Sequence, residues 1–209
     1  MKILILGATG KTGRLLVNQA LEKGYFVTAF ARNPSSINLK HPNFNIFKGN
    51  ILDNKAVDGA VKGKGAVISA LGTKSIKKDT SISDGVRNII NAMKNNEVKR
   101  IIFMSSLGVG DSRGQLKFLY NYFVVPFILK NMFEDKERQE KLLLESDLDW
   151  TIVRPGVLTS GIMTGNYKTG FSNTDKSIKV KISRSDVAHF ILKQITDNTY
   201  VKRIVGLSY

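Results

Sequence analysis

The chain has 209 residues and a formal net charge of +15, because 32 lysines and arginines face only 17 aspartates and glutamates. This length fits one domain whose core is large enough to need no covalent cross-link. The chain contains no cysteine, which excludes disulfides, thiolate metal sites and cysteine nucleophiles. Its two histidines, His41 and His189, argue against a histidine-rich metal site or a Ser-His-Asp triad, so we expect no metal.

The positive charge attracts anions, and nucleic acid is one candidate partner. The lysines are scattered, however, with no long basic run, so we interpret the charge as a surface that steers small anionic molecules and expect no nucleic acid partner. A nucleic-acid binder remains an alternative that rests on net charge alone. The first apolar run, residues 3–6, stops at Gly7 and is too short for a signal peptide or a membrane span. We therefore expect a cytoplasmic protein without stable membrane insertion.

Along the chain, short apolar runs rich in β-branched residues alternate with helical stretches, which is typical of a parallel sheet with crossover helices. The apolar runs predict strands at residues 2–6, 26–31, 44–48, 66–70, 100–104, 150–153 and 203–205. Helical spacing predicts helices at residues 11–23, 53–61, 83–95 and 186–195, and a mostly helical stretch at 115–144 with a break near Pro126. Residues 154–178 are rich in Gly, Thr, Ser and Asn and predict a loop.

The predicted fold class is α/β, a doubly wound parallel sheet in a single domain spanning residues 1–209. Residues 115–145 and 155–180 are expected to form a small helical cap on the substrate side. We expect Trp150 in the core, His41 exposed, and His189 as a buried or half-buried structural residue.

The strongest motif is a GxxGxxG pattern between the first strand and the first helix, where a dinucleotide loop belongs. Glycines at these positions let the chain turn tightly and bring backbone N–H groups up to a pyrophosphate, and the helix N-terminus adds a partial positive charge. No Gly-Lys-Ser/Thr closes the loop as in a Walker A motif. The predicted cofactor-binding residues of the loop are Gly7, Thr9, Gly10, Lys11, Thr12 and Gly13.

The end of the second strand indicates which dinucleotide binds. NAD-binding folds carry an acidic residue there to hold the ribose 2′-hydroxyl, but no Asp or Glu occurs in residues 23–52. Arg32 instead offers a guanidinium fork suited to the 2′-phosphate of NADP. Lys11 and Arg14, beside the loop, could add positive charge. We therefore expect NADP(H) to be preferred over NAD(H).

Beyond this loop, the chain resembles the atypical short-chain dehydrogenase/reductase proteins with an NAD(P)-binding Rossmann fold, and within them the flavin reductase/biliverdin-IXβ reductase type. The resemblance covers nearly the whole chain. The glycine loop and the Asp-Trp-Thr-Ile-Val-Arg-Pro-Gly string at residues 149–156 are specific to the superfamily, while Leu-Gly-Thr at 71–73 and Gly-x-Arg-Asn-Ile at 85–89 point to the branch. Its other carriers are Arg32, Met104-Ser105-Ser106 and residues 185–190.

The resemblance implies a role for each of several segments. The loop after the fourth strand would run beside the cofactor ribose and nicotinamide, and one serine after the fifth strand would lie near the nicotinamide. Residues 155–158 would line the nicotinamide pocket, and the pair at 49–50 would lie near the adenine, although Asn50 stands where relatives often have Asp. The implied cofactor-binding residues are Ala70, Leu71, Gly72, Thr73, Asn50, Pro155, Gly156 and Val157, and the implied catalytic residues are Ser105 and Ser106.

Two departures from the family pattern bear on the chemistry. Typical members use a Tyr-x-x-x-Lys pair, in which the tyrosine transfers the proton, but here Met132 stands four residues before Lys136. Lys136 alone is interpreted as a surface residue or cofactor contact rather than a catalyst. A histidine that some relatives have after the sixth strand is replaced by Gly156 or Val157.

Without the tyrosine, a coherent reaction is hydride transfer from NADPH to a flat conjugated acceptor such as a flavin, quinone or tetrapyrrole, with the proton taken from water. The positive surface favours an anionic, aromatic acceptor. Aromatic residues within 116–133 could stack on its ring or belong to the core of the cap, and the same stretch could instead lie on an anionic membrane.

Three other functions are weighed against this reductase. The main alternative is a non-enzymatic NADP(H) sensor of the nitrogen-regulator type, which would act through a protein partner. An isomerase or epimerase of the extended group is disfavoured by the missing tyrosine, and the nucleic-acid binder stands as above. We expect a monomer or a homodimer.

Overall fold

The computed structural model describes residues 1–72, 78–115, 129–171, 175 and 177–209. The strands are β1 (Lys2–Leu6), β2 (Phe26–Ala31), β3 (Phe44–Lys48), β4 (Ala66–Ser69), β5 (Arg100–Met104), β6 (Asp149–Pro155), β7 (Val157–Thr159), β8 (Lys168–Thr169), β9 (Lys181–Ser183) and β10 (Arg203–Ser208). The α-helices are α1 (Lys11–Glu22), α2 (Asn54–Val61), α3 (Ser81–Asn95), α4 (Lys130–Leu144) and α5 (Arg184–Lys193). Short 3-10 turns are η1 (Pro34–Ser36), η2 (Gly110–Ser112) and η4 (Asn198–Tyr200).

The main sheet has the strand order β3-β2-β1-β4-β5-β6-β10-β8. All its neighbours pair in parallel except β8, which runs antiparallel to β10. The chain moves outward from β1 through β2 to β3 and then returns to place β4 on the other side of β1. In open α/β sheets such a reversal marks the crevice in which ligands bind, beyond the carboxyl ends of the strands.

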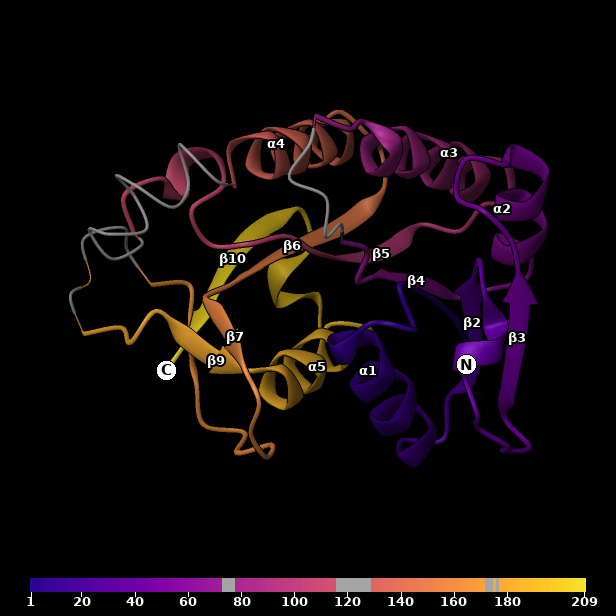
Figure 1. Ribbon diagram of the computed structural model, residues 1–209, viewed down its shortest axis with the longest axis horizontal. Coiled ribbons are helices and arrows are strands. Elements are labelled where there is room, and N and C mark those ends of the chain that lie inside the picture. Colours follow the sequence, from indigo (N-terminus) through magenta and orange to yellow (C-terminus); the bar gives the residue numbers. More distant parts are fainter. Residues whose placement is uncertain (73–77, 116–128, 172–174, 176) are drawn as a thin grey trace.

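Helices cover both faces of this sheet, with α2, α3 and α4 on one face and α1 and α5 on the other (Figure 1). Strand β1 shows how the two cores are filled. Its side chains alternate, so Ile3 and Ile5 join the core under α1 and α5, while Leu4 and Leu6 join the core under α2, α3 and α4. A strand that is buried on both faces is apolar throughout, and this is why the apolar run at residues 2–6 predicted β1.

The first five predicted strands and the helices all occur, with bounds that differ by at most two residues outside 115–144. Trp150 is buried, His41 is exposed and His189 is half-buried, with its Nδ1 2.8 Å from the Tyr167 hydroxyl. The predicted helical stretch at 115–144 contains α4. Residues 116–128, which include Pro126 and most of the aromatic residues expected to stack on the acceptor, lie outside the described residues.

The prediction of a continuous loop at residues 154–178 is wrong. Strand β6 continues through Pro155, and β7 and β8 follow within the supposed loop. Strand β9 was not expected, and it pairs with β7 in a separate parallel pair. These strands have two or three residues each, so none is long enough to give a periodic pattern.

Asp186, in the first turn of α5, fastens the connection between β7 and β8. Its fully buried carboxylate accepts hydrogen bonds from the backbone N–H groups of Thr164 and Gly165 and from the hydroxyls of Thr164, Ser183 and Tyr209. Burial raises the pKa of Asp186, but these hydrogen bonds outweigh it, so the pKa lies below its ordinary value. The carboxylate therefore stays ionised and ties three segments together.

Among the described residues, no helix is long and apolar enough to cross a membrane. The alternative of a membrane-surface segment concerned residues 116–133, most of which lie outside the described part of the chain.

Candidate cofactor and acceptor site

The glycine loop joins β1 to α1 in a tight turn that only glycine fits at two of its positions. Gly7 has a φ of +78°, and a Cβ added there would lie 2.4 Å from the carbonyl oxygen of Ala70 at the end of β4. A Cβ on Gly13 would lie 2.1 Å from the carbonyl oxygen of Gly7. The glycines therefore let the loop fold onto itself and onto the neighbouring strand, as a dinucleotide loop requires.

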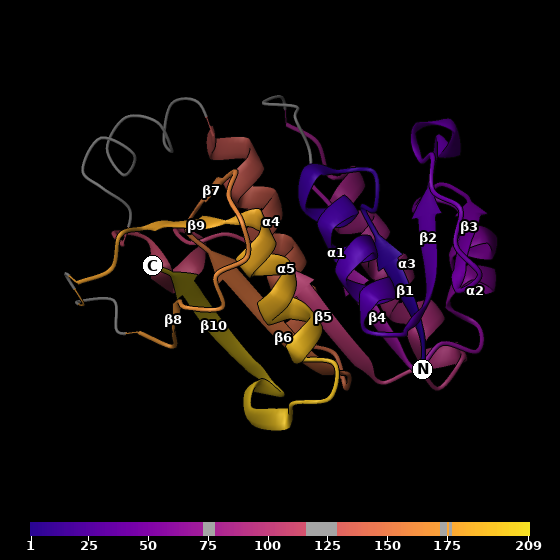
Figure 2. The ribbon, with the colours of Figure 1, turned by 90° about the horizontal axis from the view of Figure 1, so that it is seen from below.

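The start of α1 offers unpaired donors at the same place. Helix α1 has no side-chain cap and no acidic residue in its first turn. Within the described residues, the backbone N–H groups of Lys11, Thr12 and Gly13 have no hydrogen-bond partner. In Figure 2, β2 and β3 point toward the edge at which α1 begins. Orphan N–H groups at a helix N-terminus form an anion site, so this edge fits a pyrophosphate.

Thr9, Gly10 and Lys11 are exposed, whereas Thr12 and Gly13 are buried. The loop therefore exposes its middle residues, while Ala8 before them and Thr12 and Gly13 after them are buried.

Two arginines lie at the corner between the loop and the end of β2. Arg32 directly follows β2, is exposed and makes no hydrogen bond or ion pair with any described residue. Arg14 is engaged, because its guanidinium donates to the carbonyl oxygens of Thr9 at 3.2 Å and Ser36 at 2.8 Å. Arg14 thus fixes the segment after β2 against the glycine loop and leaves Arg32 free for a ligand.

Asn50, the predicted adenine neighbour, is exposed just after β3. Its Oδ1 accepts a hydrogen bond from the N–H of Leu52 at 3.2 Å. This local turn uses one acceptor position of the side-chain oxygen, while the amide NH2 group makes no hydrogen bond to a described residue.

The segment after β4 continues the same edge. The N–H of Ala70 donates to the carbonyl oxygen of Leu6 at 3.0 Å, which places Ala70 directly beside the glycine loop. Leu71 packs against the core under α3, and Gly72 is exposed. Thr73, also predicted to bind the cofactor, lies outside the described residues.

The two candidate serines after β5 differ in their environment. Ser105 is 3% exposed, and its Oγ has no hydrogen-bond partner within the described residues. Ser106 is partly buried and its hydroxyl donates to the carbonyl oxygen of Leu107 at 3.2 Å. A buried hydroxyl without a partner is costly, so Ser105 is the serine that a ligand would satisfy.

Residues 155–157 turn the chain from β6 into β7 at this edge. Pro155 ends β6, Gly156 is buried, and Val157 starts β7 with 40% of its surface exposed. A Cβ on Gly156 would lie 2.7 Å from the backbone of Val180. Val180 itself has a φ of +54°, which a β-branched residue rarely adopts. The backbone here is therefore strained and tightly packed next to the predicted nicotinamide pocket.

An apolar cluster, separate from the two cores, lies beyond the end of β5. Its buried members are Leu107, Val109 and Phe133, and the side chains packed against them are Leu129, Met132, Phe171, Ile178 and Val180. Met132, which stands at the position of the family tyrosine, is partly buried and packs against this apolar cluster.

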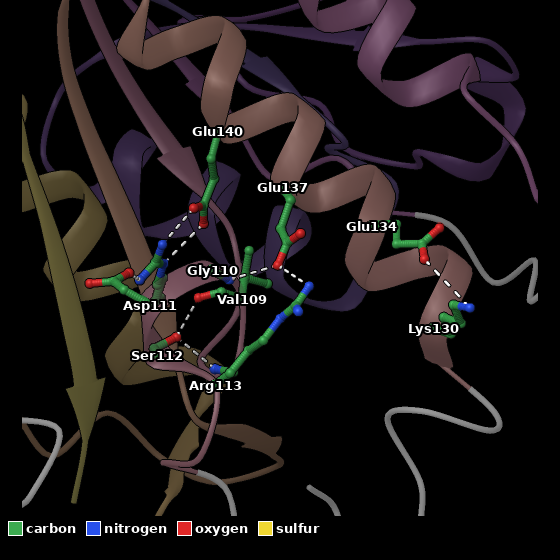
Figure 3. Close-up of polar contacts among 11 residues, drawn as sticks. Val109, Gly110, Asp111, Ser112, Arg113, Lys130, Glu134, Glu137 and Glu140 are labelled. Atoms are coloured by element: carbon green, nitrogen blue, oxygen red, sulfur yellow. Dashed lines mark hydrogen bonds and ion pairs between the residues drawn. The ribbon is translucent and has the colours of Figure 1, made fainter.

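Next to this cluster, the face of α4 that packs on the sheet carries a buried charged side chain, Glu140. Arg154 of β6 donates from Nε and Nη2 to both carboxylate oxygens of Glu140, at 3.0 and 2.6 Å, and also pairs with Asp111 of η2. The side chains of Arg154 and Glu140 are 6% and 5% exposed. Figure 3 shows Glu140 and Glu137 pointing from α4 toward the η2 segment, where Glu137 accepts from the N–H of Gly110.

Lys136, interpreted from the sequence as a surface residue or cofactor contact, is half-buried on α4 between these two groups of residues, and its role stays a prediction. Burial lowers the pKa of Lys136, and the carboxylates of Glu140 and Asp135 oppose this only in part. Sequence reasoning also missed the Arg154–Glu140 pair. The signal was present, since an arginine inside an apolar strand needs a buried acidic partner.

The nominated residues that the structure describes thus line one edge of the sheet from β3 to β6, and the glycine loop, the unpaired N–H groups and the Ser105 hydroxyl fit a dinucleotide. The chain matches the NAD(P)H-binding family over residues 7–198. A protein of Saccharomyces cerevisiae, UPF0659 protein YMR090W, is 28% identical over an alignment of 223 residues. The alignment covers 99% of this chain and 92% of that protein.

Solved structures agree with this assignment. A Rossmann-fold NAD(P)-binding family protein from Shigella flexneri has a TM-score of 0.75 and 28% identity, over 99% of this chain and 92% of that chain. ChuY, an anaerobillin reductase from Escherichia coli O157:H7, has a TM-score of 0.82 and 25% identity, over 99% and 96% of the two chains. The chain therefore belongs to the NAD(P)H-binding family and is a Rossmann-type oxidoreductase that uses a nicotinamide cofactor.

Proposed function

We propose that the protein is an NADPH-dependent reductase that delivers hydride to a flat conjugated acceptor of the flavin, quinone or tetrapyrrole type. The observation that carries this proposal is the apolar cluster around Leu107, Val109 and Phe133, with Met132 packed on it in place of the family tyrosine. A thioether cannot transfer a proton to an alkoxide, so reduction of simple ketones is disfavoured. An acceptor that delocalises its own negative charge, and whose ring packs on apolar side chains, suits this surface.

The chain's own residues supply binding and alignment. The unpaired N–H groups of Lys11, Thr12 and Gly13 would hold the pyrophosphate, and the buried Ser105 hydroxyl would bond to the nicotinamide end. The bound cofactor supplies the hydride. The strained, closely packed backbone at Gly156 and Val180 would form a rigid wall that holds the acceptor against it.

The preference for NADPH rests on Arg32. Its exposed guanidinium has no described partner at the end of β2, and Arg14 orders the neighbouring loop through its bonds to Thr9 and Ser36. A 2′-phosphate would give Arg32 the bidentate partner that it lacks. The high positive charge of the chain would favour the same cofactor and an anionic acceptor.

The proposal is tested by the rate at which the purified protein oxidises NADPH and NADH when FMN, a quinone or biliverdin is supplied. The anaerobillin reductase among the similar structures makes the tetrapyrrole a necessary member of this set. Turnover with NADPH preferred supports the proposal. Tight NADPH binding without turnover of any acceptor contradicts it and favours the sensor.

A further inference from the structure

We propose that Lys136 is the proton donor that completes reduction of the acceptor, an inference that rests on the proposed reductase function. The proposed reaction needs one proton for every hydride delivered. The apolar cluster that would hold the acceptor supplies no such group, because its members are aliphatic, aromatic and thioether side chains.

The position of Lys136 on α4 follows from its neighbours one turn away on each side. Met132 packs against the apolar cluster beyond β5, and Glu140 bonds to Arg154 of β6. Residues four apart on a helix share a face, so Lys136 lies on the face of α4 that meets the carboxyl ends of β5 and β6.

Ser105 faces the same space from the sheet. Side chains alternate along β5, and Ile101 and Phe103 both lie in the core under α3 and α4. Ser105, two residues beyond Phe103, therefore points to the α4 side. Its N–H donates to the carbonyl oxygen of Val153, which precedes Arg154 on β6. The buried Ser105 hydroxyl has no partner within the described residues, and it can bridge Lys136 to a ligand.

Lys136 also lacks a partner of its own. Within the described part of the chain it makes no hydrogen bond or ion pair, although Asp135 and Glu140 are nearby. Both carboxylates are already engaged, because Glu140 accepts twice from Arg154 and Asp135 accepts from Gln139 and Arg138. A half-buried ammonium without a committed partner among the described residues can give its proton to a neighbouring anion.

The charged groups around Lys136 set its titration. Asp135 and Glu140 lie on its own helix, Arg154 on β6 and Asp111 on η2. On α3, which packs against α4, the titratable side chains of Asp84, Arg87 and Lys94 are exposed. Burial prevails over the two nearby carboxylates, so the pKa of Lys136 falls below its ordinary value of 10.5.

The hydride adds to a carbon of the acceptor and brings two electrons, which leaves a delocalised anion. The N–H bond of the Lys136 ammonium breaks, the proton forms a bond to the acceptor anion, and neutral Lys136 takes a new proton from water. No further oxidant or reductant is needed.

The test compares Lys136→Met and Lys136→Arg with Lys141→Met, an exposed lysine on the same helix as the control. For Lys136→Met we expect kcat to fall by about 100-fold or more, while the dissociation constant for NADPH, measured by its fluorescence, stays unchanged. In the wild type kcat should decline as the pH rises through the pKa of Lys136. Lys136→Arg keeps the positive charge, but its guanidinium does not give up a proton, so its kcat should fall as far as that of Lys136→Met, and Lys141→Met should match the wild type.

A second readout needs no turnover. With lysine labelled by 13C at Cε, the apoprotein should show a resonance that titrates below the ordinary lysine pKa and is missing from Lys136→Met, while the resonance of Lys64, whose pKa burial also lowers, should remain. Unchanged kcat in Lys136→Met, an ordinary Lys136 titration, or a rise in the NADPH dissociation constant that matches the fall in kcat/KM would each overturn the inference. The last result would make Lys136 a cofactor contact. Absence of turnover in the wild type would overturn the reductase function itself, which separates the two failures.

Discussion

The two halves of the sheet hold their parts of the site by different means. Around β1 and β4, the site is shaped by backbone, because Gly7 and Gly13 allow close approaches that no other residue permits. Around β6 and α5, it is held by buried charges, with Arg154 paired to Glu140 and Asp186 bonded to three segments. The end of the site near the glycine loop therefore depends on local shape, and the end around β6 and α5 on long-range pairing.

The part of the sheet around β6 and α5, held by buried charges and called the pairing half below, should lose more stability on mutation. Glu140→Ala tests this most strongly. Removing Glu140 leaves the buried Arg154 guanidinium with only the exposed Asp111 as a partner among the described residues. Loss of one member of a buried pair costs about 3–5 kcal/mol, and denaturant unfolding should show a loss of this size. Glu145→Ala is the control, since Glu145 is exposed and its ion pair to Lys141 is 3.8 Å long. Equal losses in the two variants would remove the contrast between the halves.

The part of the sheet around β1 and β4, where the glycine backbone shapes the site, can be tested with two glycines that have the same φ. Gly7 and Gly24 both have a φ of +78°, but a Cβ added to Gly24 meets no atom within 4 Å. Gly24→Ala should therefore cost about 1 kcal/mol from backbone strain alone. Gly7→Ala adds a clash with the Ala70 carbonyl, which should raise the cost to about 2–4 kcal/mol and abolish NADPH binding. Retention of NADPH affinity by a folded Gly7→Ala protein would show that the loop does not cradle the pyrophosphate.

Asp186→Asn examines the pairing half through its dependence on pH. The pKa of Asp186 is lowered, so its stabilising effect is complete above the unfolded pKa of about 3.9 and disappears as the pH falls through the lower folded value. At neutral pH the variant should lose about 2 kcal/mol, the scale of hydrogen bonds to a charged group. The difference from the wild type should shrink as the pH falls below about 4. Asp147→Asn, on an exposed aspartate, should change stability little at either pH.

The same contrast explains what the sequence could predict. Strands β1 to β5 and the glycine loop carry local signals, such as an apolar run that ends at Gly7. Strand β9 and the burial of Lys136 carry none, because both depend on partners far along the chain. The choice between Ser105 and Ser106 was partly predictable. Side chains alternate along β5, so Ser105 is expected on the same buried side as Ile101 and Phe103. The roles of these residues toward a cofactor or acceptor stay predictions.

Arg32→Ala should have the smallest effect, and it tests whether shape alone selects the cofactor. An exposed Arg32 that binds the 2′-phosphate should contribute about 1.4 kcal/mol, so its loss should reduce the ratio of NADPH to NADH affinity about 10-fold, with NADH binding unchanged. Arg203→Ala removes another exposed arginine, on β10, and should leave the ratio unaltered. Arg14→Ala should weaken both cofactors together, because Arg14 secures the loop through Thr9 and Ser36 and not through a phosphate. If Arg32→Ala keeps the wild-type ratio while Arg14→Ala lowers it, the 2′-phosphate site belongs to Arg14, and the free guanidinium of Arg32 has another purpose.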